Sequence, residues 1–143
     1  MEERKGEEDV KISIEMPIRI RPYDVDFMGI INNTVYPKYF EALSTSALES
    51  RMNLSEMLNQ NEGPVVMETN IKYLAPISLS SKPIGKVTLT FKPPFRWFAE
   101  MTIKDKKDEN LIYCVGTRKG CYINLKTKRP AKIPEKLLYL NLD

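Results

Sequence analysis

The sequence contains no histidine among its 143 residues. This absence excludes a Ser-His-Asp or Cys-His catalytic system within the polypeptide, and it equally excludes a histidine-based metal site. Acid–base chemistry near neutral pH must therefore use carboxylates, tyrosine, lysine or water. Metal binding is not expected.

Cysteine and long apolar runs are also scarce. Cys114 and Cys121 are the only cysteines, and their odd spacing along a strand-like segment points them to opposite faces. We therefore expect two buried free thiols and no disulfide. No apolar run approaches the length of a membrane span, and no charged-then-apolar leader begins the sequence. These absences predict a cytoplasmic protein without a membrane segment.

The net charge of +3 is unevenly distributed. Residues 1–9 hold five acidic and two basic side chains and no apolar residue after Met1. We predict that they form a disordered lead-in and that residues 10–143 form one domain. The basic remainder suits an anionic partner such as a nucleotide or a phosphate-bearing carrier. It carries no helix-turn-helix or RNA-binding signature, so no nucleic-acid partner is expected.

Hydrophobic periodicity predicts one long helix among several strands. Residues 10–21 alternate as a half-buried strand, in which Pro17 indicates an edge strand or a bulge. A helix is predicted over 33–51, with its apolar stripe at Tyr36, Tyr39, Phe40, Leu43 and Ala47. A short helix follows at 54–59, with Asn53 as its N-cap.

The rest of the sequence is typical of β structure. Strands are predicted at 65–73, 84–91, 95–104 and 111–125, the last bulged at Gly116 or Gly120, and a short terminal helix begins near Ile133. This order predicts an α+β domain in which one helix lies across an antiparallel sheet.

The segment before the long helix carries the candidate chemistry. It contains Asp24, Asp26 and Gly29, and then the pair Asn32-Asn33. A carboxylate is thus placed just ahead of a helix N-terminus, where unpaired backbone N–H groups and the helix dipole can hold a developing oxyanion. Hydrolysis of an acyl ester or thioester requires this combination.

Each of these residues also has a structural explanation. Asp26 can satisfy backbone N–H groups of its own loop, and Asn32 and Asn33 are preferred helix caps. Asp24 is expected to tie the turn together. Capping and catalysis are compatible, because a capped helix can still present free N–H groups.

Three segments in order resemble one known family. Residues 23–41 are similar to a D-x-D-x-x-G-h-x-N-N-x-x-Y motif and the helix that follows it. Residues 64–76 are similar to a strand that ends in tyrosine, two residues and proline, and residues 126–134 are similar to the turn and tail that end the domain. Together they resemble the 4-hydroxybenzoyl-CoA thioesterase-like branch of the hotdog-fold superfamily. The resemblance implies an α+β hotdog fold, in which a curved antiparallel sheet of about five strands wraps around one long central helix. Many members carry histidine where this chain has Ile30.

The resemblance also implies residue roles. Asp26 matches the catalytic aspartate, acting as a general base on water or as a nucleophile that forms a mixed anhydride, and Asn32 and Asn33 belong to the catalytic helix start. Tyr36 and Glu41 are candidate substrate contacts; a core aromatic and a solvated or interface residue are their alternative roles. The carrier phosphates are expected first at Arg96, with Lys92, Lys128 and Arg129 as weaker candidates. Ordinary surface charge is the alternative role of all four.

The implied activity is hydrolysis of a fatty or aromatic acyl-CoA by a cytoplasmic homodimer or a homotetramer built from two dimers. CoA is then part of the substrate, and no cofactor is expected. The alternative is a non-hydrolytic acyl-CoA or acyl-carrier binding protein, either a sensor or a subunit of a larger complex. A hotdog hydratase typically needs histidine, which this chain lacks. The acyl group and the choice between CoA and acyl-carrier protein stay open.

Overall fold

The computed structural model describes residues 9–138. Apart from Asp9, the predicted lead-in lies outside this range, as does the end of the predicted domain. The elements in chain order are β1 (Val10–Pro17), the 3₁₀ turns η1 (Pro22–Asp24) and η2 (Asn33–Val35), α1 (Tyr36–Glu49), α2 (Leu54–Gln60), β2 (Glu62–Tyr73), β3 (Pro83–Lys92), β4 (Arg96–Asp105), β5 (Ile112–Asn124) and α3 (Glu135–Leu138).

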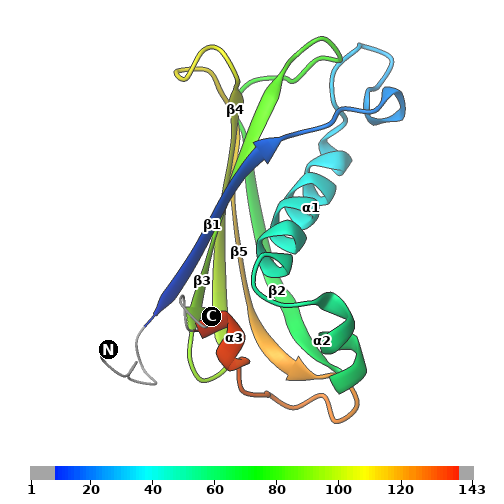
Figure 1. The fold of residues 1–143 in the computed structure, drawn as a ribbon. Coiled ribbons are helices and arrows are strands. Elements are labelled where there is room, and N and C mark those ends of the chain that lie inside the picture. Colours follow the sequence, from blue (N-terminus) through cyan, green and yellow to red (C-terminus); the bar gives the residue numbers. More distant parts are fainter. Residues whose placement is uncertain (1–8, 139–143) are drawn as a thin grey trace.

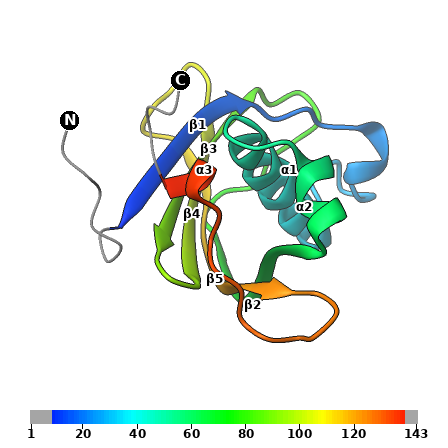
Figure 2. The same ribbon diagram turned by 60° about the horizontal axis from the view of Figure 1, so that its bottom comes forward.

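The five strands form one antiparallel sheet in the order β1-β3-β4-β5-β2. Figures 1 and 2 show the sheet curving around α1, with α2 and α3 toward one end of the molecule. The predicted architecture of one helix across a curved sheet is confirmed. β1 is an edge strand that ends at Pro17, earlier than the predicted residue 21, and the edge position suits a residue without a backbone N–H. β2 forms the opposite edge.

The helices predicted over 33–51 and 54–59 are confirmed, and the predicted terminal helix is α3. The first is divided into η2 and α1, and Pro37 lies in the first turn of α1, where its missing N–H is tolerated. In the second, the side chain of Asn53 accepts a hydrogen bond from the backbone N–H of Ser55, which is the capping role expected of it.

The core lies between α1 and the concave face of the sheet. The predicted stripe of α1 is buried, and it packs on the inward-facing side chains of the strands. Two glycines allow close approach: a Cβ at Gly85 would lie 2.7 Å from Leu43 Cδ1, and one at Gly116 would lie 3.2 Å from Phe40 Cε2. The helix therefore rests on strands that lack side chains at these points.

The predicted bulge at Gly116 or Gly120 is wrong. Both glycines are paired, whereas the register shifts at Met67 of β2 and at Tyr113 of β5, which have no partner across the strand pairs. In these strands a glycine marks a place where a neighbouring group comes close, Phe40 against Gly116 for example, and not an extra residue.

Both cysteines are free thiols, as predicted. Cys114 is buried on the concave face, and burial raises its pKa to about 12, so the thiolate is disfavoured. Cys121 is only half-buried, so the prediction of two buried thiols is wrong for this residue, which lies on the opposite face of β5 from Cys114. Among residues 9–138, no helix has the length and apolar character needed to cross a membrane.

Candidate active site

The loop that enters α1 is folded back on itself. Val25 pairs with Ile31, the backbone N–H of Asp26 donates to the Ile30 carbonyl at 2.8 Å, and that of Asn32 donates to the Asp24 carbonyl at 3.0 Å. Gly29 turns the loop at a φ of 79°, a conformation that favours glycine. The loop therefore holds Asp26 and Asn32 in one compact unit at the start of the helix.

Asp26 uses one of its two carboxylate oxygens in the loop. Its Oδ1 accepts hydrogen bonds from the backbone N–H groups of Met28, at 2.8 Å, and Ile30, at 3.4 Å. Oδ2 accepts no hydrogen bond from the described residues, and the side chain is only half-buried. An oriented carboxylate with one free oxygen can take a proton from water or attack a carbonyl carbon.

Asp24 lies two residues earlier in a different environment. It is 5% exposed, and its Oδ2 accepts hydrogen bonds from the Arg21 backbone N–H at 3.0 Å and from Tyr39 Oη at 2.9 Å. Burial and this bond to Asp24 raise the pKa of Tyr39, so its hydroxyl stays protonated as the donor. Asp24 thus ties the loop to α1, the structural role expected of it.

Asn32 and Asn33 occupy the turn immediately before α1. Asn32 Oδ1 accepts from the backbone N–H and the hydroxyl of Thr34, at 3.0 and 2.9 Å, so it caps η2 as its residue type predicts. The side chain of Asn33 is exposed, and its carbonyl accepts from Tyr73 Oη at 3.3 Å. Their share in holding an oxyanion stays a prediction.

Tyr36 is placed as a core aromatic. It is 2% exposed, and its ring meets that of Tyr73 edge-on at a centroid distance of 4.9 Å. Burial raises its pKa to about 12. Contact between Tyr36 and a substrate stays a prediction, and the packing alone explains the residue.

Glu41 pairs with a buried arginine that sequence reasoning missed. Its Oε2 lies 2.7 Å from Nη1 of Arg118, which is 7% exposed, while Nη2 of the same arginine donates to the Pro37 carbonyl at 3.1 Å. The Arg118 guanidinium also lies 4.5 Å from the centre of the Phe40 ring. The alternation of β5 could have revealed this arginine, because it shares the inward phase of Gly116.

Lys92 and Arg96 are brought together, but not near Asp26 of the same chain. They face each other across the β3–β4 hairpin, at the opposite end of the sheet from the loop (Figure 1). They border an outward-facing hollow together with Phe95, Phe98 and Lys119, and Lys92 Nζ lies 5.9 Å from the centre of the Phe98 ring. The weaker candidates Lys128 and Arg129 lie exposed in the turn after β5.

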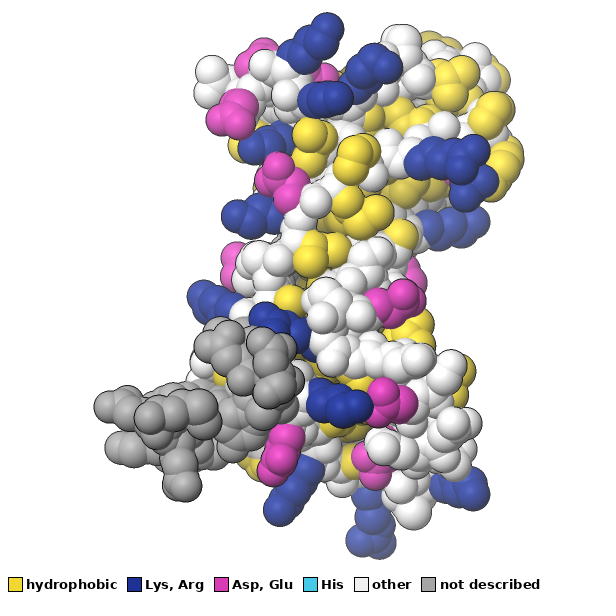
Figure 3. All heavy atoms as spheres, viewed as in Figure 1, with side chains coloured by type: hydrophobic (Ala, Val, Ile, Leu, Met, Phe, Trp, Pro, Cys, Tyr) yellow, Lys and Arg dark blue, Asp and Glu magenta, His cyan; other side chains and the backbone are white. Residues whose placement is uncertain are grey.

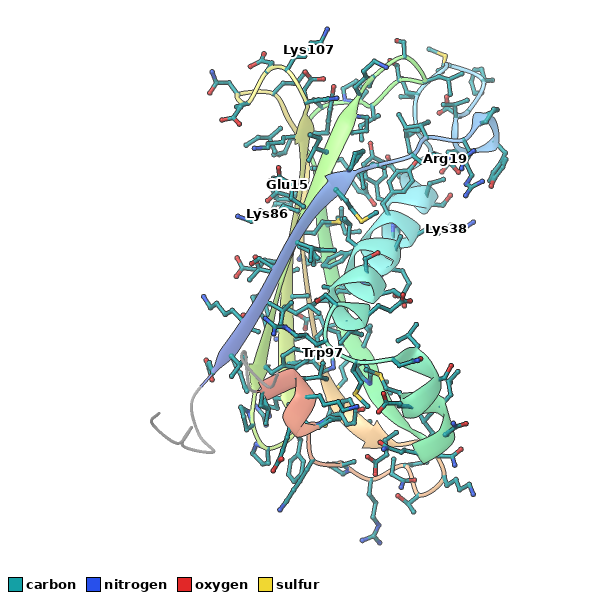
Figure 4. All side chains as sticks on the ribbon, viewed as in Figure 1. Glu15, Arg19, Lys38, Lys86, Trp97 and Lys107 are labelled. Atoms are coloured by element: carbon teal, nitrogen blue, oxygen red, sulfur yellow. The ribbon has the colours of Figure 1, made fainter. Side chains whose placement is uncertain are left out.

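Other cations lie closer to Asp26. A groove of ≈ 320 Å³ beside the first half of α1 is lined by Arg19, Arg21 and Lys38. Figure 4 shows Arg19 and Lys38 toward the loop end of the molecule. The sequence did not indicate this set because Lys38 lies on a separate segment, which only folding brings beside Arg19 and Arg21.

Apolar side chains are exposed around the same loop. Figure 3 shows them gathered at that end of the molecule, with Lys and Arg side chains beside them. Phe27 is 97% exposed, Met28 69% and Leu79 51%, and the segment of Leu79 is joined to the loop by the hydrogen bond from Ile31 N–H to the Ile77 carbonyl. Gathered apolar exposure of this kind marks a surface that another molecule covers.

Comparison with known proteins matches most of the chain. The model of the thioesterase-like superfamily matches residues 20–140. The acyl-acyl carrier protein thioesterase ATL3, chloroplastic, of Arabidopsis thaliana is 26% identical over 136 residues, which cover 93% of this chain and 70% of that protein.

Two solved structures share the fold. Slr0204, a 1,4-dihydroxy-2-naphthoyl-CoA thioesterase from Synechocystis, superposes with a TM-score of 0.78 at 15% identity, covering 89% of this chain and 92% of the other. The DHNA-CoA thioesterase from Staphylococcus aureus gives a TM-score of 0.75 at 21% identity, covering 85% and 80%. At these identities the likeness establishes the fold, and the predicted hotdog fold is confirmed.

Proposed function

This chain belongs to the thioesterase-like superfamily, and from that membership we propose that it is an acyl-CoA thioesterase whose reaction is carried by Asp26. The observation that supports this role is the hydrogen bonding of its carboxylate. Oδ1 accepts hydrogen bonds from two backbone N–H groups, while Oδ2 has no partner among the described residues. An oriented but incompletely bonded carboxylate beside a helix start is suited to hydrolysis.

The proposed reaction has two forms. As a general base, Asp26 takes a proton from water while the water oxygen attacks the thioester carbonyl; collapse then expels the thiolate and leaves the carboxylic acid. As a nucleophile, Asp26 forms a mixed anhydride with loss of the thiolate, and water then hydrolyses the anhydride. In both forms the carbonyl oxygen becomes negatively charged, and backbone N–H groups at the turn capped by Asn32 are the proposed donors to it.

We further propose that the enzyme is a homodimer joined through β2. This edge strand, Glu62–Tyr73, carries exposed side chains along most of its length, including Val66 at 41% and Met67 at 73% exposure. A long edge with unpaired backbone groups is a template for pairing with another chain. A two-fold axis across it makes the pairing antiparallel, so the Tyr73 end of one strand lies against the Glu62 end of the other.

This pairing has a consequence for the site. The Tyr73 end lies beside Asn33 and the loop of Asp26, whereas the Glu62 end lies toward the hairpin of Lys92 and Arg96. The dimer would therefore bring the carboxylate of one copy toward the cations of the other, where the phosphates of CoA or of an acyl-carrier protein would bind. The cytoplasmic location and the assembly of two dimers into a tetramer stay predictions.

The test is thiol release from acetyl, benzoyl, hexanoyl and palmitoyl CoA thioesters by the wild type and Asp26→Asn. Asparagine keeps the Oδ1 acceptor of the loop but loses the basic oxygen, and a loss of general-base catalysis is worth about 10²- to 10⁴-fold in rate. Asp108→Asn is the matched control, because Asp108 also holds its own loop through Oδ1, at 3.0 Å from the Asn110 N–H. Equal rates in wild type and Asp26→Asn would remove Asp26 from the mechanism, and no turnover of any thioester would favour the non-hydrolytic acyl binder.

A further inference from the structure

Three buried polar atoms lack hydrogen bonds around one cavity. They are Ser44 Oγ on α1, Trp97 Nε1 on β4 and Arg118 Nε on β5, and none has a hydrogen-bond partner in the described part of the chain. All three residues line a single cavity of ≈ 50 Å³ between α1 and the sheet. Trp97, labelled in Figure 4, lies toward the α3 end of the sheet.

The chemistry of these atoms specifies an acceptor. The indole N–H of Trp97 and the Nε–H of Arg118 can only donate, and the Ser44 hydroxyl can donate or accept. Trp97 and Arg118 are each 7% exposed, so bulk water does not satisfy them. Buried donors are nearly always paired in folded proteins, and a cavity that collects unpaired ones is complementary to an acceptor oxygen.

The charge balance makes that oxygen a neutral one. Arg118 carries the positive charge of the cavity, but the Glu41 carboxylate already lies 2.7 Å from its Nη1. A second carboxylate would be desolvated next to Glu41, which opposes its entry. A hydroxyl or ketone oxygen accepts the same hydrogen bonds without this repulsion.

The size and walls of the cavity define the rest of the ligand. Apart from the polar groups, its walls include Leu48, Leu89 and Phe91, and the exposed residues Glu41 and Val66 place its opening between α1 and β2. Its volume is about a third of the ~150 Å³ of an engineered cavity that holds benzene. An aromatic ring is therefore too large, whereas the last few atoms of an aliphatic chain fit.

We infer that this cavity receives the far end of an aliphatic acyl chain that carries a neutral oxygen, as a hydroxyl or a ketone. The inference rests on the proposed thioesterase function and narrows its substrate from acyl thioesters in general to oxygenated aliphatic ones. Because the opening lies beside β2, the chain enters from the side where the proposed dimer places the Asp26 loop of the other copy.

The test compares matched ligands that differ only in the oxygen. Straight-chain acids from hexanoic to dodecanoic, each unsubstituted, with a terminal hydroxyl or with a ketone next to the last carbon, are measured as free acids for binding and as CoA thioesters for kcat/KM. At the best chain length we expect the oxygenated ligand to be preferred at least ~10-fold by the wild type, because a site with buried donors discriminates against ligands that leave them unpaired.

Two variants remove single polar groups. Trp97→Phe keeps most of the aromatic surface without the N–H, and Ser44→Ala removes the hydroxyl; each should reduce the preference several-fold. Tyr122→Phe is the matched control, because its buried hydroxyl also lacks a hydrogen bond but lies outside the cavity lining, so the preference should not change.

The outcomes separate the inference from the proposed function. Turnover of thioesters with no preference for oxygen at any chain length would overturn the inference and leave the thioesterase in place. A preference that survives both Trp97→Phe and Ser44→Ala would overturn it as well. Preferential binding of oxygenated free acids without turnover of any thioester would support the cavity and refute the enzyme.

Discussion

The two ends of the sheet are built differently. At the end where β2 stops, irregular loops hold Asp26 through backbone hydrogen bonds and leave Phe27 almost fully exposed. At the other end the β3–β4 hairpin pairs Lys92 with Arg96, and the inward-facing Trp97 borders a cavity. The candidate reactive group and the candidate recognition groups thus occupy opposite ends, and one chain alone does not join them.

The loop end contains a second contrast, between two aspartates two residues apart. Asp24 is buried and bonded to Tyr39, whereas Asp26 is half-buried with one oxygen unbonded. Identical side chains therefore lie in different environments: that of the first suits the support of the fold, and that of the second suits chemistry.

Subunit complementation tests whether the two ends of the sheet act together across the dimer. Asp26→Asn and the double variant Lys92→Glu/Arg96→Glu should each be nearly inactive. Mixed and reassembled in equal amounts, they should recover about a quarter of the wild-type activity, because half of the dimers are mixed and each has one site with both parts intact. Thiol release before and after mixing measures this. If both parts of the site come from one chain, mixing restores nothing.

A charged edge should separate the two copies. Val66→Lys together with Met67→Lys places charges on the free edge of β2, which natural sheets use to prevent pairing. We expect a monomer by sedimentation and a fall in kcat/KM of roughly tenfold or more, because a composite site needs its second chain.

The control for that change lies on the opposite edge of the sheet. Lys11→Glu alters an exposed residue of β1 and should leave the dimer and its activity intact. An active dimer in the β2 variant would show that the copies do not associate through this strand.

The contrast between the aspartates predicts a difference in stability. Asp24→Ala leaves the buried hydroxyl of Tyr39 without its acceptor and should lower the free energy of unfolding by about 1–3 kcal/mol. Asp26→Asn keeps its loop bonds and should stay within ~0.5 kcal/mol of the wild type. Urea unfolding measures both. The double variant Asp24→Ala/Tyr39→Phe should cost less than the sum of its parts, since no orphaned hydroxyl remains.

Alkaline pH should lower the free energy of unfolding through buried groups at both ends of the sheet, and this is the smallest of the expected effects. Burial raises the pKa of Tyr36, at the start of α1, and that of Tyr122, near the end of β5, from 10.0 to about 12. It raises the pKa of Cys114, near the start of β5, from 9.0 to about 12. The unfolded chain therefore loses these protons first as the pH rises. The contribution of these three groups to stability should be constant below pH ~9 and fall as the pH increases toward ~12.

The alkaline effect is read from the urea midpoint at successive pH values. Cys114→Ala should remove the earliest part of the fall, because the ordinary pKa of that thiol, 9.0, is the lowest of the three. A midpoint that does not move up to pH ~11 would contradict the burial of these groups.

Much of the fold follows from local signals in the sequence. Pro17 indicated an edge strand or a bulge, Asn53 a helix cap, and the stripe of Tyr39 and Leu43 the buried side of α1, because each depends on a few neighbouring residues. The bulges at Met67 and Tyr113 could not be predicted this way, since they depend on register against another strand.

The candidate site also contains features that local sequence predicts and features that depend on contacts between distant elements. The loop of Asp26 and the cap at Asn32 are contiguous and were recognisable from their order. The pairing of Glu41 with Arg118 joins α1 to β5 across 77 positions, and no spacing rule connects them. A charged residue on the inward phase of an apolar strand was the available signal, and it indicates burial without naming the partner.

Gly116 gives the molecule a way to change its substrate range indirectly. A methyl group there would press on Phe40, the ring on which the Arg118 guanidinium lies, and Arg118 borders the cavity. Descendants of this protein could therefore acquire a tighter or displaced cavity by exchanging a glycine that lies outside the cavity lining. Evolutionary tuning of specificity in this fold can begin beneath the helix, at a distance from the reacting atoms.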